Sequence, residues 1–264
     1  MSITNKEISS TYKDWLSISN SNSGFDSNID QVKSGNGNGS ALYLSTNNLK
    51  VQPTADSTTN SVIYDKDGNI LLQVDSTNDA VKALGNHVNT QYAYFGVSSS
   101  DTIFAGMSAN THTAVPFNSN GLSGALIALG TGTNPDTSLS VSTTADDLVN
   151  CIMYVDSNIS VDAVYVWMGS DTATADTACR FHLMSYTIDA GNSATSGDLS
   201  SGVVVADGSD INNAGYEQAY YQSMTIQSAS VAAGQALFFL VRMDSVNSDV
   251  SINCKIKYHL IPMN

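Results

Sequence analysis

Residues 250–260 alternate apolar and polar side chains over their whole length. The apolar positions are Val250, Ile252, Cys254, Ile256, Tyr258 and Leu260, and the polar positions between them are Ser251, Asn253, Lys255, Lys257 and His259. Successive side chains of a β-strand point to opposite faces of a sheet, so the pattern predicts a strand with one buried face. A strand of this kind needs further strands and a core to pack against, which favours a β-rich fold.

Three more segments in the C-terminal part of the chain, 159–168, 179–185 and 236–243, predict long strands separated by polar turns. Predicted strands that recur roughly every 10–15 residues, with no helical periodicity between them, are typical of an antiparallel sandwich. We therefore predict a jelly-roll-like β-sandwich over residues 96–264, which is a common size for one domain.

Composition supports an all-β fold for the whole chain. Ser, Thr and Asn together make up about a third of the residues, and the only glutamates are Glu7 and Glu217. Ser, Thr, Asn and Asp side chains form hydrogen bonds with their own backbone and so compete with helix formation. This composition argues against a helical bundle, a coiled coil or a collagen.

The charge pattern argues against nucleic acid as a partner. The net charge is -14, and between Lys82 and Lys255 the only cationic side chains besides histidine are Arg180 and Arg242. Neutralising phosphates requires several clustered cations, which this chain does not offer. A soluble, self-repelling surface is the favoured interpretation, with cation binding by some aspartates as the alternative.

Residues 41–95 predict a series of short strands. Segments 61–64 and 70–74 are joined by Asp65-Lys-Asp-Gly-Asn69, a favourable sequence for a hairpin turn. A calcium loop is the weaker interpretation, because Gly68 is the fourth residue of that segment and not the sixth. Strands this short make a poor core alone, so we predict an intertwined homotrimer that pools Leu42, Leu44, Val51, Val62, Ile63, Leu71, Leu72 and Val74.

Residues 1–40 are largely polar, with one apolar cluster. Ile8, Tyr12, Trp15 and Leu16 have helical spacing, which predicts a short helix near the N-terminus. A polar segment that carries a Trp commonly buries it in a partner, so we predict that Tyr12, Trp15 and Leu16 are anchors to a neighbouring protein. Packing of this segment onto its own domain is the alternative.

No catalytic motif emerges from the sequence. The candidates are His87, His112, His182 and His259, the segment Gly121-Leu-Ser-Gly124, and the acid pairs Asp146/Asp147 and Asp207/Asp210. None has the spacing of a metal site, a nucleophile elbow or a defined acid–base pair. Cys151, Cys179 and Cys254 each lie in an apolar or alternating run and are predicted to be buried free thiols. We therefore predict a protein that is not an enzyme and has no cofactor and no metal.

Clustered tyrosines are the best candidates for binding. Tyr216, Tyr220 and Tyr221, and also Tyr92, Tyr94 and Phe95, could contact a sugar or a partner protein. Packing in a core or an interface is the more conservative interpretation of both clusters. No segment has the length of a membrane helix or the pattern of a signal peptide, so we expect cytoplasmic synthesis without membrane insertion.

Three segments resemble structural proteins of marine tailed bacteriophages. Thr11-Tyr-Lys-Asp-Trp-Leu16, followed by Asn20, is similar to an N-terminal entry segment of such proteins. Residues 49–51 through 65–78 look like the hairpin repeats of phage fibres, and residues 231–242 resemble the penultimate strand of trimeric jelly-roll tips.

This resemblance implies a virion structural protein, synthesised in the host cytoplasm, that forms a homotrimer. It also implies that the N-terminus binds other virion proteins and that the C-terminal domain faces outward, as a fibre, a spike or a capsid decoration with a possible role in host attachment through a surface glycan. The alternative is a carbohydrate-binding or polysaccharide-degrading spike domain.

Overall fold

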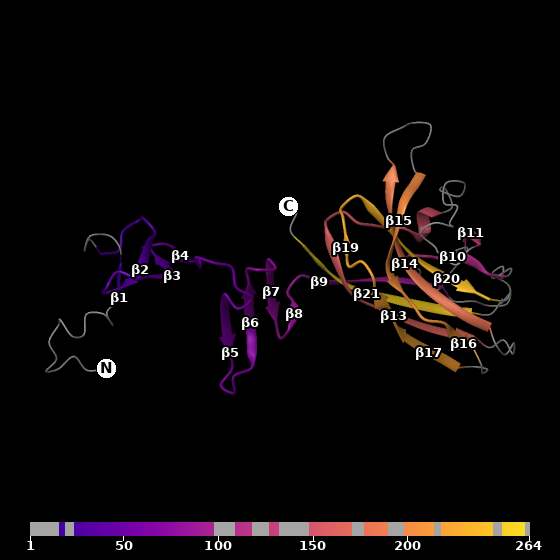
Figure 1. Ribbon diagram of the computed structural model, residues 1–264, viewed down its shortest axis with the longest axis horizontal. Helices are drawn as coiled ribbons and strands as arrows, with labels where there is room; N and C mark the ends of the chain where they lie inside the picture. The colour runs from indigo at the N-terminus through magenta and orange to yellow at the C-terminus, as the bar shows by residue number, and fades with distance from the viewer. Residues whose placement is uncertain are drawn as a thin grey trace. The chain divides into compact units, whose positions relative to one another are not determined.

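The chain folds into antiparallel β-sheets, as shown by the computed structural model in Figure 1. The structure describes residues 16–18, 24–97, 109–117, 127–131, 148–170, 177–189, 198–213, 218–244 and 250–261. Within these residues, helical backbone is confined to Leu148 and the adjoining 3-10 turn, Val149–Cys151. The all-β prediction is therefore confirmed. The chain divides into two compact units, residues 1–86 and 87–264.

The N-terminal unit contains small sheets of short strands. The first sheet has the order β1-β2-β3-β4, with bounds Leu16–Ile18, Asp30–Ser34, Gly39–Leu44 and Leu49–Val51. The second has the order β5-β6-β7-β8, with bounds Ser61–Tyr64, Ile70–Asp75, Ala80–Ala83 and Asn86–His87. β8 ends one residue inside the second unit.

The predicted hairpin between β5 and β6 is confirmed. Asp65 holds its turn: Oδ1 accepts hydrogen bonds from the backbone amides of Asp67 and Asn69, both at 2.8 Å, and Oδ2 accepts one from Asn69 Nδ2 at 2.8 Å. Gly68 has φ of 86°, a conformation that glycine adopts at little cost. The Asp65 side chain therefore stabilises the turn by accepting these hydrogen bonds.

The prediction of a short helix near the N-terminus is wrong at Leu16, which is the one residue of the predicted pattern that the structure describes. Leu16 begins strand β1 and pairs with Ser34 of β2. Ile8, Tyr12 and Trp15 lie outside the described residues. The backbone of β1 forms hydrogen bonds with β2. The spacing of apolar residues within one segment does not reveal such a partner strand, so it could not distinguish this strand from a helix.

The C-terminal unit consists of two antiparallel sheets. The eight-stranded sheet has the order β11-β10-β20-β14-β15-β18, with β12 paired to β20 and β16 paired to β14. Its strands are β10 Thr111–Val115, β11 Ile127–Thr131, β12 Met153–Tyr154, β14 Thr177–Asp189, β15 Asp198–Asp207, β16 Ile211–Asn213, β18 Thr225–Ile226 and β20 Gln235–Met243.

The five-stranded sheet has the order β17-β13-β21-β9, with β19 paired to β13. Its strands are β9 Thr90–Val97, β13 Ile159–Ser170, β17 Gln218–Ser223, β19 Ser230–Val231 and β21 Val250–Leu260. The four long strands predicted from alternation and apolar runs are thus all present. β21 has the predicted bounds.

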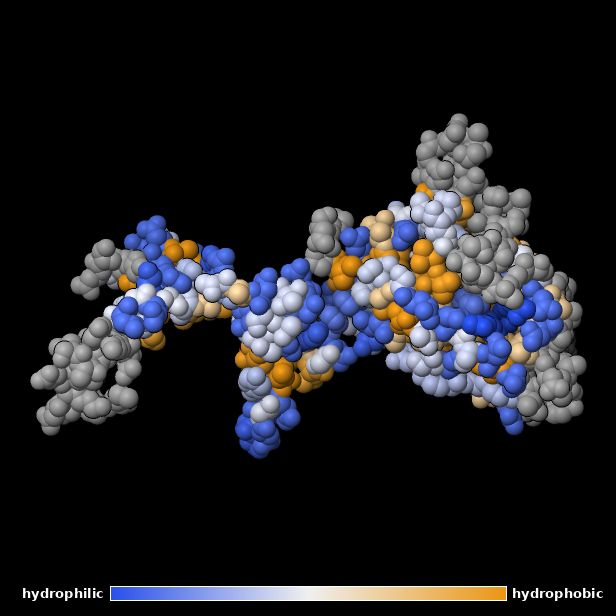
Figure 2. All heavy atoms as spheres, in the orientation of Figure 1, coloured by the Kyte–Doolittle hydropathy of each residue, from blue (hydrophilic) through white to orange (hydrophobic). Residues whose placement is uncertain are grey.

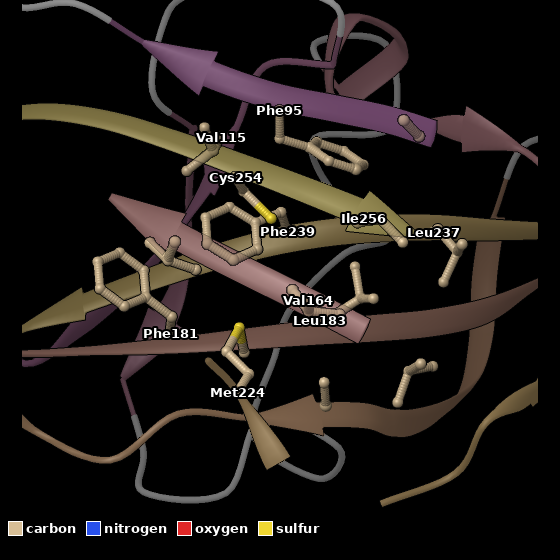
Figure 3. Packing of buried hydrophobic residues seen from close by; sticks show 14 of the residues in the cluster. Phe95, Val115, Val164, Phe181, Leu183, Met224, Leu237, Phe239, Cys254 and Ile256 are labelled. Atoms are coloured by element: carbon tan, nitrogen blue, oxygen red, sulfur yellow. The ribbon is translucent and has the colours of Figure 1, made fainter. Parts of the chain in front are cut away.

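The main core of this unit is an apolar cluster to which both sheets contribute, shown in Figure 3. Phe95 and Cys254 of the five-stranded sheet and Phe181 and Phe239 of the eight-stranded sheet all belong to it, each with no exposed surface. The three cysteines are free and buried, as predicted. Burial of this kind supplies the main favourable term in folding.

Strand β20 explains why the sequence 236–243 is apolar without alternation. Leu237, Phe239, Val241 and Met243 belong to the main core, whereas Ala236, Phe238 and Leu240 belong to a second apolar cluster. Because consecutive side chains point to opposite faces, both faces of this central strand are buried. The second cluster also contains Leu129, Leu148 and Cys151.

The boundary between the units differs from the predicted one. Residues 90–97 form β9, which pairs with β21 and places Phe95 opposite Cys254. The short-strand region therefore ends near residue 86 and does not extend to residue 95. Alternation within 90–97 is as compatible with a sandwich strand as with a hairpin repeat, and the distant partner strand decides between them.

Candidate binding face

The outer face of the five-stranded sheet carries a cluster of exposed aromatic side chains. Along β13, Val164, Val166 and Met168 are buried in the core. Tyr165 and Trp167 occupy the intervening positions and therefore point away from the core. The strand register sets Trp167 opposite Tyr221 of β17 on one side and Asn253 of β21 on the other.

Tyr165, Trp167 and Tyr221 form a contiguous group of three rings. The ring centroids of Trp167 and Tyr221 are 5.3 Å apart, those of Tyr165 and Tyr221 are 6.2 Å apart, and those of Tyr165 and Trp167 are 6.5 Å apart. Trp167 is 41% exposed and Tyr221 is 57% exposed. Large aromatic side chains that remain accessible beside one another can stack against a flat apolar surface of a ligand.

The same face continues across β21 and β9. Lys255 is aligned between Tyr165 and Tyr94, and Lys257 is aligned with Tyr92. The ammonium of Lys255 lies 4.2 Å from the centroid of the Tyr92 ring, within range of a cation–π interaction. We call Tyr92, Tyr94, Tyr165, Trp167 and Tyr221 the aromatic face.

The predicted binding residues are divided by the structure. Tyr221 belongs to the aromatic face, whereas Tyr220 is half-buried against the main core. Adjacent residues of one strand point to opposite faces, so the two tyrosines cannot share a surface. Tyr216 lies outside the described residues, and so do Tyr12 and Trp15 of the predicted anchor. Leu16, the third predicted anchor, is 76% exposed on β1.

Sequence reasoning missed Tyr165 and Trp167 as binding candidates. Their signal was available, because they alternate with buried valines in the predicted strand 159–168. What the sequence could not provide was the register that sets Tyr221 beside them. Tyr92 and Tyr94 also belong to the face, while Phe95 of the same predicted cluster is a core residue.

A separate pocket of about 340 Å³ lies between β9, β12, β13 and β21. Its polar groups include Gln91, whose Oε1 accepts a hydrogen bond from Tyr258 Oη at 3.0 Å, and Asp156. Burial of Tyr258, and to a smaller degree the negative charge of Asp156, raises the pKa of the Tyr258 hydroxyl. That hydroxyl is therefore a neutral donor at physiological pH.

The buried thiols are unsuited to nucleophilic chemistry. Burial raises the pKa of Cys151 to about 12, and it raises the pKa values of Cys179 and Cys254 as well. A thiol reacts as its thiolate, which these environments disfavour.

Comparisons with known proteins leave the family open. No known protein family matches the sequence, and no curated protein matches it. Among solved structures, the xylanase 10B of Clostridium thermocellum, in a form comprising its CBM22-1 and GH10 modules complexed with xylohexaose, is similar over 66% of this chain. The identity is 13% and the TM-score 0.23, and the match spans 29% of the xylanase chain, so this likeness supports no functional argument. Among the described residues, no helix is long and apolar enough to cross a membrane.

Proposed function

We propose that this protein is a non-enzymatic virion structural protein of a tailed phage, anchored to the particle through its N-terminal part and exposing its C-terminal β-domain. The observation that carries the proposal is the contrast in burial between the two units. The C-terminal unit has an extensive core of its own, whereas the N-terminal unit leaves most of its large apolar side chains exposed.

In the described part of the N-terminal unit, the buried hydrophobic residues are Val32 and Ala80. Its exposed large hydrophobic residues are Leu16, Phe25, Ile29, Leu49, Val51, Ile63, Tyr64, Ile70, Leu71, Val81 and Leu84. Figure 2 shows such apolar atoms on the surface of the β5–β8 sheet. Contiguous apolar surface on a protein marks an interaction site.

These features favour further copies of the same chain as the partners that cover the exposed apolar side chains. Short sheets with open edges gain both hydrogen-bond partners and apolar burial when several copies wrap around one axis. A threefold arrangement closes more of the short edges than a twofold one. The proposal is therefore a homotrimer, with the segment before β1 left to contact other virion proteins.

The topology of the C-terminal unit supports a jelly-roll-like sandwich, because successive strands pass repeatedly from one sheet to the other, as β12 to β13, β13 to β14 and β20 to β21 do. The unit is also suited to an exposed position. The surplus of acidic over basic residues in the chain favours solubility at the high local density of a particle.

Sedimentation of the full-length chain tests the trimer. We expect a species of three chains, each of 27.8 kDa, at micromolar concentration. Leu49→Ser combined with Ile63→Ser should weaken assembly, because both side chains are more than half exposed in the single chain. Val203→Ser, at a position that is 42% exposed in the C-terminal unit, is the matched control and should leave the trimer intact. A wild-type monomer would refute the proposal.

The aromatic face favours one second candidate, a carbohydrate-binding head. Sugar rings present apolar C–H faces that stack on aromatic side chains, and Trp167 and Tyr221 are both accessible for such stacking. Trp167→Ala and Tyr221→Ala should each abolish binding to host-surface polysaccharide in a pull-down, while Tyr154→Ala, a 60% exposed tyrosine away from this face, should not. Cleavage of that polysaccharide by the purified protein would instead support the enzymatic alternative.

A further inference from the structure

We propose that His87, Asp162 and His259 form a binding site for a first-row divalent transition metal of the zinc class in the C-terminal unit. Among the described residues, these three are the group whose potential ligand atoms all lie within 4.8 Å of one another. The inference is independent of trimer assembly and of glycan binding.

The donor set suits such an ion. Two imidazole nitrogens and one carboxylate oxygen are typical ligands of Zn²⁺, and imidazole also suits Co²⁺, Ni²⁺ and Cu²⁺. Three protein ligands leave a fourth, open position on a tetrahedral ion for water. Hard cations such as Ca²⁺ prefer six or more oxygen ligands, which this group does not offer.

The spacing of the two imidazoles is close to that of two ligands of one ion. The His87 and His259 rings are stacked with centroids 3.7 Å apart and planes 4° from parallel. Two zinc–nitrogen bonds of about 2.1 Å at a tetrahedral angle separate their nitrogens by about 3.4 Å. An imidazole nitrogen binds a metal in the plane of its ring, so the two rings must rotate out of this parallel stacking to point at a common ion.

The backbone is shaped to bring Asp162 to this point. β13 pairs with β21 in regular register except for one irregularity between Val161 and Ala163, where Asp162 is the additional residue. Bulges of this kind redirect a side chain that would otherwise follow the strand alternation. Asp162 Oδ1 lies 2.9 Å from His259 Nδ1, so the bulge sets the carboxylate against the imidazole.

Two hydrogen bonds fix the turn that carries His87. Thr90 Oγ1 donates to the His87 carbonyl at 2.7 Å, and Asn89 Nδ2 donates to the Leu260 carbonyl at 2.7 Å. The second bond ties the turn directly to the residue after His259. Groups that hold ligands in place before binding reduce the entropy that an ion must overcome to collect them.

The position gives the site a structural role. His87 is the first residue of the C-terminal unit, while Asp162 and His259 belong to two of its central strands. An ion bound by all three would fasten the start of this unit to β13 and β21. Metal binding then stabilises the folded C-terminal unit, because the ligands are not assembled in the unfolded chain.

Calorimetric titration of the untagged, chelator-treated full-length chain with Zn²⁺ tests the proposal, together with visible absorption spectra after addition of Co²⁺. We expect one equivalent of metal per chain and a tetrahedral Co²⁺ spectrum. His87→Ala, His259→Ala and Asp162→Ala should each weaken binding by at least about tenfold. Asp67→Ala removes an exposed carboxylate in the β5–β6 turn, outside the proposed ligand group, and it should retain the stoichiometry and the spectrum.

Melting temperatures without metal show whether each variant is folded, and Zn²⁺ should raise the melting temperature of the wild type but not of the His87→Ala variant. The proposal is overturned if the wild type binds no stoichiometric Zn²⁺. It is equally overturned if the triple variant His87→Ala, Asp162→Ala, His259→Ala binds Zn²⁺ as tightly as the wild type, because the ligands would then lie elsewhere.

Discussion

Arg180 of β14 and Asp207 of β15 form a two-pronged ion pair on the eight-stranded sheet, with Nε 3.2 Å from Oδ1 and Nη2 2.7 Å from Oδ2. His182 is almost completely buried beside them, with Nδ1 3.0 Å from the same Oδ1 but not aligned to form a hydrogen bond. Arg180, Arg242 and His112 surround this imidazole with further positive or ionisable groups. The charged Arg180–Asp207 pair thus lies next to His182, whose burial favours the neutral imidazole.

The burial of His182 predicts that the folded protein loses stability in acid. Burial, opposed by Asp207 and reinforced by His112 and the two arginines, lowers the pKa of His182 to about 4 from 6.5. Between these values the unfolded chain takes up a proton that the folded chain does not, so stability falls as the pH is lowered from about 6.5 to 4. The full loss is about 3 kcal/mol. His182→Gln should flatten this part of a urea-denaturation profile measured against pH; an unchanged slope would contradict the assignment.

The main core predicts the cost of removing a central ring. Phe239 has no exposed surface and stacks on Phe181 with centroids 5.6 Å apart and planes at 10°. Phe239→Ala should lower the free energy of unfolding by about 3–5 kcal/mol, because it deletes a buried ring and leaves a cavity. Val203→Ala, at a 42% exposed position, should cost under about 0.5 kcal/mol. Similar losses in the two variants would show that Phe239 is not a core residue.

The β5–β6 turn predicts a local effect of backbone conformation. A Cβ at Gly68 would meet no atom within 4 Å, so its φ of 86° is the sole obstacle to a side chain. Gly68→Ala should destabilise the hairpin by about 1 kcal/mol and speed hydrogen exchange of the Asp65 amide about fivefold. Gly68→Asn should cost less, since asparagine tolerates this conformation. Equal exchange rates in all three proteins would be the contrary result.

The thiols predict selective labelling. Cys179 and Cys254 are completely buried, and burial raises the pKa values of both. The folded protein should therefore resist iodoacetamide at pH 8, while the protein in concentrated urea should acquire a label on each of its three cysteines. Mass spectrometry distinguishes the two outcomes, and rapid labelling of the folded chain at Cys254 would contradict its placement in the core.

The sequence by itself determined the features that depend on neighbouring residues. Alternation specified β21 to its bounds, the apolar run specified β20, and Asp65 with Gly68 specified a hairpin turn. Each of these signals is local, because side-chain direction and turn geometry follow from a few consecutive residues.

The tertiary structure decided whatever depends on which strands become neighbours. Pairing with β21 assigned residues 90–97 to the C-terminal unit, and pairing with β2 made Leu16 part of a strand. The register between β13 and β17 placed Tyr221 beside Trp167. The bulge in β13 set Asp162 against His259, a residue 97 positions away. Contacts at such separations are selected by the packing of the whole core, and no short pattern in the chain records them.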